Sequence, residues 1–248
     1  MASVAAATSA PDEEGGLVRG SVAVAGGVLA HLILGTMYCW GNFIAYVPPT
    51  LLFFDGLPHP GATPDAIQVM PFALLALNLG MPVGAFANKR AGPRVTTLIG
   101  CSLMVLGTYA GSFQTRLLPF MLYYSLLAGV GTGMGYSTPM IAGWSWFPGN
   151  KGLVSGLILF GFGAGAYIFN KVGTNLALGG LPWGALLRRL ASFYAVISLF
   201  GSLLITQRPP APVPVVVDEC DVSEENTGGM VPVSPPEVCD VPGAVSTA

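Results

Sequence analysis

Long stretches without a charged residue follow one another along the chain up to Gln207. A helix needs about 20 apolar residues to cross a hydrocarbon core of about 30 Å. Runs of about that length lie at residues 20–47, 66–87, 95–113, 117–141, 152–170 and 190–206. Every Asp, Glu, Lys and Arg falls outside them, as expected where an uncompensated charge in lipid costs several kcal/mol. The pattern predicts an all-α polytopic membrane protein with six transmembrane helices.

Composition narrows the class of protein further. Charged residues make up 9% of the chain, too few to cover a water-soluble surface, since an ordinary globular protein has about a quarter. The formal net charge of -2 excludes a basic nucleic-acid binder. The 4 Cys form no CxxC pair, so the sequence indicates no metal site, no disulfide framework and no cofactor. The bilayer itself is the first expected partner.

The two ends differ from the middle of the chain. Residues 1–19 are rich in Ala and Ser at their start and lack the basic region of a signal peptide, so we expect a disordered N-terminal segment. Residues 207–248 are Pro-rich and acidic and contain no aromatic residue. Such a segment has too little apolar surface to offset the entropy of ordering, which predicts a disordered tail.

Basic residues between the runs suggest an orientation. Lys89, Arg90 and Arg94 lie in one short loop, and short basic loops stay in the cytoplasm. With the N-terminus inside, the cytoplasmic side carries the larger share, namely Arg19, Lys89, Arg90, Arg94, Lys151 and Arg208. Both termini are therefore predicted to be cytoplasmic, in a multi-pass protein placed in the plasma membrane rather than in an organelle.

Glycines recur at helix-packing intervals in the fourth and fifth runs. Pairs four residues apart let two helices approach closely. The glycines concerned are Gly129, Gly131, Gly133, Gly135, Gly161 and Gly165. Because no strand precedes them and the third glycine of GxGxxG is out of register, a phosphate loop is not indicated. We predict contact between the fourth and fifth helices through these residues.

Motifs in the same region carry a family resemblance. The glycine-rich run at residues 127–136, the turn Trp146-Phe147-Pro148-Gly149-Asn150-Lys151-Gly152-Leu153 and the following glycines resemble the fourth helix, cytoplasmic turn and fifth helix of the oxalate/formate antiporters. These belong to the major facilitator superfamily (MFS), close to the monocarboxylate transporters. Residues 35–40 are similar to the family's Gly-x-x-Tyr-x-Trp segment. The resemblance covers roughly residues 20–208 and implies the N-terminal six-helix half of a twelve-helix transporter.

The loop between the second and third runs resembles the superfamily's basic signature loop. The resemblance makes Asn88, Lys89, Arg90, Gly92 and Arg94 a gating loop. Asn88 stands where the family has an acidic residue, and one residue is inserted before Gly92. The charge contact that this loop makes in the family is therefore in question.

Substrate-binding residues follow from the resemblance as well. Tyr38 and Tyr136 match aromatic positions that line the family's cavity, although ordinary packing is the alternative. Met37 replaces a polar residue and indicates a less polar substrate than oxalate. His31 lies seven residues before Tyr38, nearly on the same helix face. It is a candidate for substrate binding or proton coupling, with a hydrogen-bonded neutral imidazole as the alternative.

The predicted function is secondary transport of a small organic anion, such as a monocarboxylate, oxalate or formate, by alternating access. No nucleophile with a base and no metal-ligand cluster indicates an enzyme. The family's carboxylate-binding basic residues belong to its second half, so a second six-helix half or a homodimer is an expected partner. The alternative is a truncated, non-transporting membrane interaction protein that needs a partner half.

Overall fold

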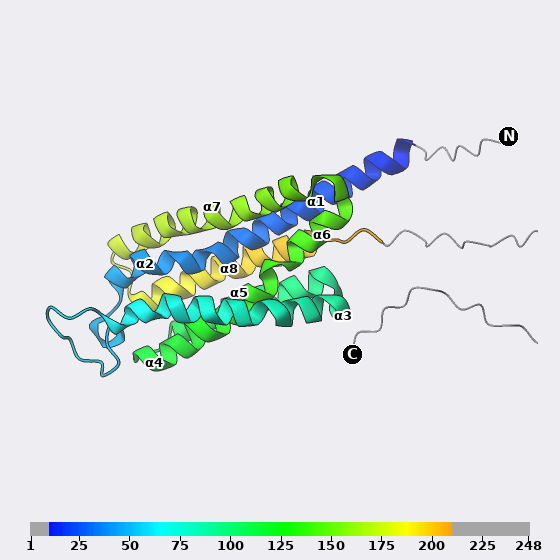
Figure 1. Ribbon diagram of the computed structural model, residues 1–248. Coiled ribbons are helices and arrows are strands. Elements are labelled where there is room, and N and C mark those ends of the chain that lie inside the picture. Colours follow the sequence, from blue (N-terminus) through cyan, green and yellow to red (C-terminus); the bar gives the residue numbers. More distant parts are fainter. Residues whose placement is uncertain (1–9, 210–248) are drawn as a thin grey trace, which may run out of the picture. The chain divides into compact units, whose positions relative to one another are not determined.

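The computed structural model describes residues 10–209, in which all regular structure is helical (Figure 1). The predicted disorder of residues 1–9 and 210–248 lies outside the described part. The longer elements are α1 (Ala10–Leu34), α3 (Val69–Gly111), α7 (Lys151–Leu178) and α8 (Trp183–Leu204). Shorter helices continue α1 and build the fourth run, namely η1 (Gly35–Cys39), α2 (Trp40–Phe43), η2 (Ile44–Tyr46), α4 (Leu117–Phe120), η5 (Met121–Leu127), α5 (Ala128–Tyr136) and α6 (Thr138–Trp146).

Five helical segments of the described part are long and apolar enough to cross a membrane. They are Gly15–Tyr46, Asp65–Gly111, Leu117–Trp146, Pro148–Leu178 and Trp183–Leu204. The second predicted span, 66–87, lies within Asp65–Gly111, and the third, 95–113, lies within it except for its last two residues. The structure thus agrees with a polytopic membrane protein, with one helical segment in place of two predicted spans.

That long segment is broken at Gly92. Its backbone there has φ 78° and ψ 170°, a conformation that L side chains rarely adopt and glycine accepts. Pro93 follows, and proline both lacks an N–H donor and pushes the preceding residue toward an extended ψ. The two legs of α3 consequently run in opposite directions along α5. The contacts that establish this are Gly80 with Val130, Gly84 with Met134, Gly100 with Gly135 and Gly107 with Ala128.

Several helices extend past their predicted ends. α1 begins at Ala10, so residues 10–19 are helical where disorder was expected. α7 continues to Leu178 and includes Lys171, and α8 begins at Trp183 and includes Arg188 and Arg189. The physical reason is that a charged side chain ends a charge-free run but does not end a helix, because backbone hydrogen bonding continues through it.

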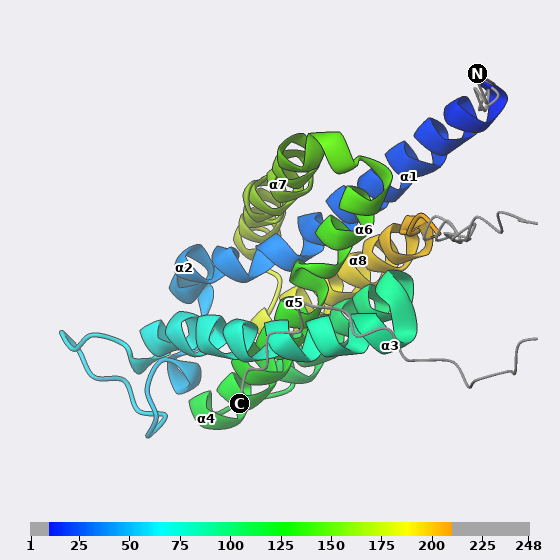
Figure 2. The same ribbon diagram turned by 45° about the vertical axis from the view of Figure 1, so that its right-hand side comes forward.

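Helix α1 forms the middle of the bundle. It packs against α7 on one side and α8 on the other, while α5 and α8 pack against α3 (Figures 1 and 2). The break at Gly92, the α6–α7 turn and the end of α8 lie at the same end of the bundle, at the right of Figure 1. A long loop between η2 and α3 lies at the opposite end.

An aromatic core closes the end of the bundle near this loop. Trp40 is 2% exposed, and its ring centroid lies 5.4 Å from that of Phe120 and 6.2 Å from that of Trp183. Its indole Nε1 donates a hydrogen bond of 2.9 Å to the carbonyl oxygen of Ala66. Trp40 therefore joins the end of α1 to the start of α3, because burial of its large ring removes apolar surface from water and its N–H still finds a partner.

The packing glycines have partners other than those predicted. A Cβ on Gly131 would lie 2.5 Å from the Gly100 carbonyl oxygen, and one on Gly133 would lie 2.9 Å from the Gly80 Cα, both on α3. Gly161 faces Val28 on α1 at 2.5 Å. Gly129, Gly131 and Gly133 thus pack on α3, whereas Gly135 and the predicted packing glycines of α7 pack on α1, which corrects the expected direct contact. Spacing reveals that a close approach exists, but not which helix approaches.

Candidate functional site

Phe162 on α7 lies close to all three residues that the sequence predicts to bind substrate. The centroid of its ring lies 5.6 Å from Tyr38, 5.5 Å from Tyr136 and 6.1 Å from His31. The His31 and Tyr136 rings are 5.4 Å apart. Tyr38 comes from η1, Tyr136 from the end of α5 and His31 from α1. We call these four residues the aromatic cluster.

The members of the aromatic cluster differ in exposure. Tyr38 is 50% exposed and His31 is fully buried at 0%, while Tyr136 and Phe162 are half-buried. The His31 Nδ1 lies 3.1 Å from the Gly27 carbonyl oxygen, one turn earlier in the same helix. Its Nε2 has no hydrogen-bond partner among the described residues. Tyr38 is thus the accessible member, and the imidazole lies behind Tyr136 and Phe162.

A polar group missed by the sequence analysis lies one turn beyond Tyr38. The Asn42 amide Nδ2 donates to the Asn170 Oδ1 at 2.9 Å and to the Thr174 Oγ1 at 2.8 Å. These bonds join α2 to α7. The available signal was the i, i+4 spacing of Asn170 and Thr174, which puts two polar side chains on one side of an otherwise apolar helix.

The signature loop makes contacts of another kind. The Arg94 Nε donates to the Ile205 carbonyl oxygen at 3.2 Å, and the Arg90 guanidinium carbon lies 4.2 Å from the Phe86 ring centroid. Asn88 has a buried Oδ1 without a hydrogen-bond partner within residues 10–209, and Lys89 is exposed. The predicted gating residues therefore surround the break in α3. Arg94 contacts a backbone carbonyl group, and Arg90 contacts an aromatic ring.

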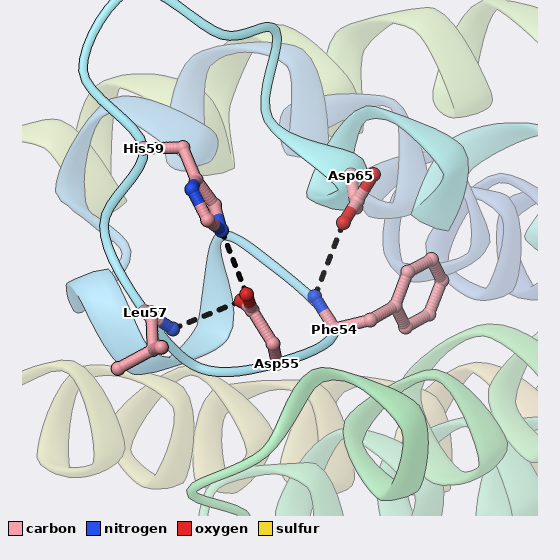
Figure 3. A network of polar contacts seen from close by, with 5 residues as sticks. All are labelled: Phe54, Asp55, Leu57, His59 and Asp65. Atoms are coloured by element: carbon pink, nitrogen blue, oxygen red, sulfur yellow. Dashed lines mark hydrogen bonds and ion pairs between the residues drawn. The ribbon is translucent and has the colours of Figure 1, made fainter.

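The loop at the opposite end is held by carboxylates. Asp65 Oδ2 accepts a hydrogen bond of 3.1 Å from the Phe54 N–H, and Asp55 Oδ1 accepts one of 3.0 Å from the Leu57 N–H (Figure 3). His59 Nε2 lies 2.7 Å from Asp55 Oδ2, in the one ion pair found among the described residues. The Leu57 N–H and then the His59 ring favour the charged carboxylate, so they hold the pKa of Asp55 below its usual value.

Comparison with known proteins finds relatives that are carriers and transporters, although no family model matches the chain. Apicoplast pyruvate carrier 1 of Toxoplasma gondii is 33% identical over 187 residues, which cover 62% of this chain and 34% of the relative. The oxalate:formate antiporter of Oxalobacter formigenes is 28% identical over 144 residues, which cover 57% of this chain and 32% of the relative. Monocarboxylate transporter 13 of Bos taurus is 35% identical over 139 residues, which cover 56% of this chain and 30% of the relative.

The chain is a homologue of MFS-type transporters. This confirms the resemblance inferred from the glycine-rich run and the turn that follows it. The MFS relatives are transporters and not enzymes, which also supports the prediction that the chain is no enzyme. The chain spans about a third of the length of each of the three MFS relatives described above.

Proposed function

We propose that the chain forms a six-helix unit of a secondary transporter that carries small organic anions, monocarboxylates first among them, by alternating access. The observation that carries this proposal is the convergence of Tyr38, Tyr136 and His31 on Phe162, with Tyr38 half exposed. Aromatic rings with hydroxyl groups suit a small anion that is part charged and part apolar. A pyruvate carrier and a monocarboxylate transporter among the relatives support this substrate class.

The length of Asp65–Gly111 supports the proposal of six crossings of the bilayer. Its 47 residues would extend about 70 Å as one straight helix, more than twice a hydrocarbon core of about 30 Å. The reversal at Gly92 divides it into two legs that each match one crossing. An even number of crossings puts both ends of the bundle's chain on one side. Lys89, Arg90 and Arg94 support a cytoplasmic position for that side. We propose the plasma membrane as the location.

Alternating access requires a second body against which the six-helix unit moves. We propose that a complementary six-helix half, or a second copy of the chain, supplies it. The unit alone is expected to bind small carboxylates weakly and to transport none, because desolvation of a carboxylate must be offset by contacts from both sides of a cavity.

Uptake into proteoliposomes tests the proposal. Labelled pyruvate, lactate, formate and oxalate are offered to the purified chain alone, and to the chain reconstituted with a complementary half. Saturable uptake only by the paired form is the expected result. Saturable exchange by a monomeric chain would contradict the need for a second half. Failure of every pairing to transport would leave the non-transporting interaction protein as the better description.

A further inference from the structure

Lys171 belongs to the apolar segment Pro148–Leu178, which is long enough to cross a membrane. Helix α7 has 28 residues, Lys151–Leu178, and a hydrocarbon core of about 30 Å takes about 20 of them. If the membrane-crossing stretch of about 20 residues is centred on α7, about four residues remain outside it at either end. Lys171 is seven residues from Leu178 (178 − 171 = 7), so it falls within the stretch. A charge at this depth is costly in lipid and is expected to have a function.

No acidic residue compensates this charge nearby. Helix α7 contains no Asp or Glu, and neither do η1 and α2, which pack beside it. Within the described part of the chain, Lys171 is in no ion pair, and its side chain is exposed. An uncompensated ammonium group at the surface of an apolar helix favours an anion from outside the bundle.

Two hydrogen-bond donors lie beside Lys171. Asn42 donates its amide hydrogens to the Asn170 Oδ1 and the Thr174 Oγ1. These oxygens are acceptors in the two bonds, so the amide hydrogens of Asn170 and the hydroxyl hydrogen of Thr174 are left to donate elsewhere. Asn42 thereby orients both side chains as donors. Positions 170, 171 and 174 fall within about 100° of the helix circumference, on one side of α7.

We propose that Lys171, Asn170 and Thr174 form the anion-recognition group of the transporter, which binds the carboxylate of the substrate. Asn42 is a positioning residue that acts through the two hydrogen bonds it donates. A carboxylate accepts charge-assisted hydrogen bonds from an ammonium group and neutral ones from amide and hydroxyl donors, and together these replace part of its hydration. Tyr38, four residues before Asn42 along the chain, offers a half-exposed ring to the apolar part of the substrate.

This assignment rests on the proposed function, yet it has a test that does not depend on transport. A water-soluble amine-acylating reagent modifies Lys171 and Lys151, which belong to the same helix and are both exposed. In detergent micelles without phospholipid, saturating pyruvate should slow acylation of Lys171 and leave the rate at Lys151 unchanged. Peptide mass spectrometry reads both rates from one sample. Pyruvamide, which lacks the negative charge, should protect neither lysine.

Variants separate this site from the general function. In the paired transporter, Lys171→Gln should raise the KM for pyruvate by about 10- to 100-fold, as expected when a hydrogen bond to a charged group is lost. Lys151→Gln should leave it unchanged. Asn42→Ala should raise the KM for pyruvate. Asn42→Asp offers no hydrogen-bond donor and should raise the KM as well, whereas Asn42→Gln should keep part of the affinity.

Each outcome decides between the two proposals. Wild-type pyruvate transport with a normal KM for Lys171→Gln and no protection of Lys171 would overturn the recognition group and leave the proposed function standing. Protection by anionic phospholipid but not by pyruvate would overturn it too, because Lys171 would then bind lipid phosphate. Absence of any pyruvate binding or uptake by the wild-type protein would overturn the proposed function, and the recognition group with it.

Discussion

The guanidinium Nε of Arg94 lies 3.2 Å from the carbonyl oxygen of Ile205, just beyond the end of α8. The last carbonyl groups of a helix have no partner within it and carry partial negative charge. The indole Nε1 of Trp146 donates to the next carbonyl oxygen, that of Thr206, at 2.8 Å. Two side chains, one beside the break in α3 and one from the end of α6, thus fix the chain where it leaves α8. This gives the signature-loop arginine a structural task.

Removal of the Arg94 side chain should weaken this end of the bundle. Arg94→Ala leaves the Ile205 carbonyl group without its charged donor, and we expect a loss of stability of about 1–2 kcal/mol. The midpoint of thermal unfolding in detergent measures it. Arg90→Ala is the matched control, since Arg90 is exposed and stacks on Phe86. An equal effect of the two substitutions would contradict the assigned role of Arg94.

Substitution of Gly133 tests the contact between α5 and α3. A leucine there would press against Leu77 and Gly80 on α3, so Gly133→Leu should strongly reduce the yield of folded protein. Gly163→Leu is the control, because no atom lies within 4 Å of its added Cβ. Size-exclusion profiles in detergent compare the yields. Wild-type yield and stability for Gly133→Leu would show that the two backbones do not meet.

Accessibility of introduced cysteines tests the six crossings. With Cys220 and Cys239 replaced by Ser, a Cys at Ala62 should react only from outside the cell and one at Gly149 only from the cytoplasm. Ala62 is exposed, and a Cβ at Gly149 would have no neighbour within 4 Å, which makes both positions tolerant. The native Cys39 and Cys101 are buried and give little background. Labelling of both introduced cysteines from one side would show that the topology is wrong.

The Asp55 carboxylate should make the outer loop sensitive to acid. Its pKa in the folded protein is lowered, so the stability it adds is present above the unfolded pKa of about 4. That contribution is lost as pH falls through the lower folded pKa. Amide hydrogen exchange at Leu57 should be faster in Asp55→Ala than in the wild type at pH 7, and the difference should narrow at pH 3. A constant difference would exclude the carboxylate as the cause.

The aromatic cluster should matter for transport by the paired protein. Phe162→Ala, Tyr38→Ala and Tyr136→Ala each remove an aromatic contact and should lower uptake about two- to tenfold without loss of expression. Phe160→Ala is the control, because Phe160 is 72% exposed on the same helix and belongs to none of the ring pairs. Normal uptake by the Phe162 variant would remove the main support for the proposed site.

The absence of charge pointed to the apolar helical segments of the described part, because lipid penalises a charged side chain in any helix. It failed at helix ends, where Lys171, Arg188 and Arg189 continue helices that the charge-free criterion had ended. Proline after glycine marked the turn at Gly92 correctly. By contrast, Phe162 resembles any other phenylalanine of an apolar run. Its contact with three nominated residues depends on how α1, α5 and α7 are placed together.

Helices α1 and α7 meet without a layer of side chains between them. The Cβ positions of Gly35 and Gly165 fall on backbone atoms of Phe162 and Leu32, respectively. Since a packed contact of this kind has nothing that deforms, the two helices should behave as one rigid body. Bending is then left to the π-helical η5, which precedes α5. A hinge at η5 would move Tyr136, at the end of α5, against His31 and Phe162 on the rigid pair, so opening of the bundle would also open the aromatic cluster.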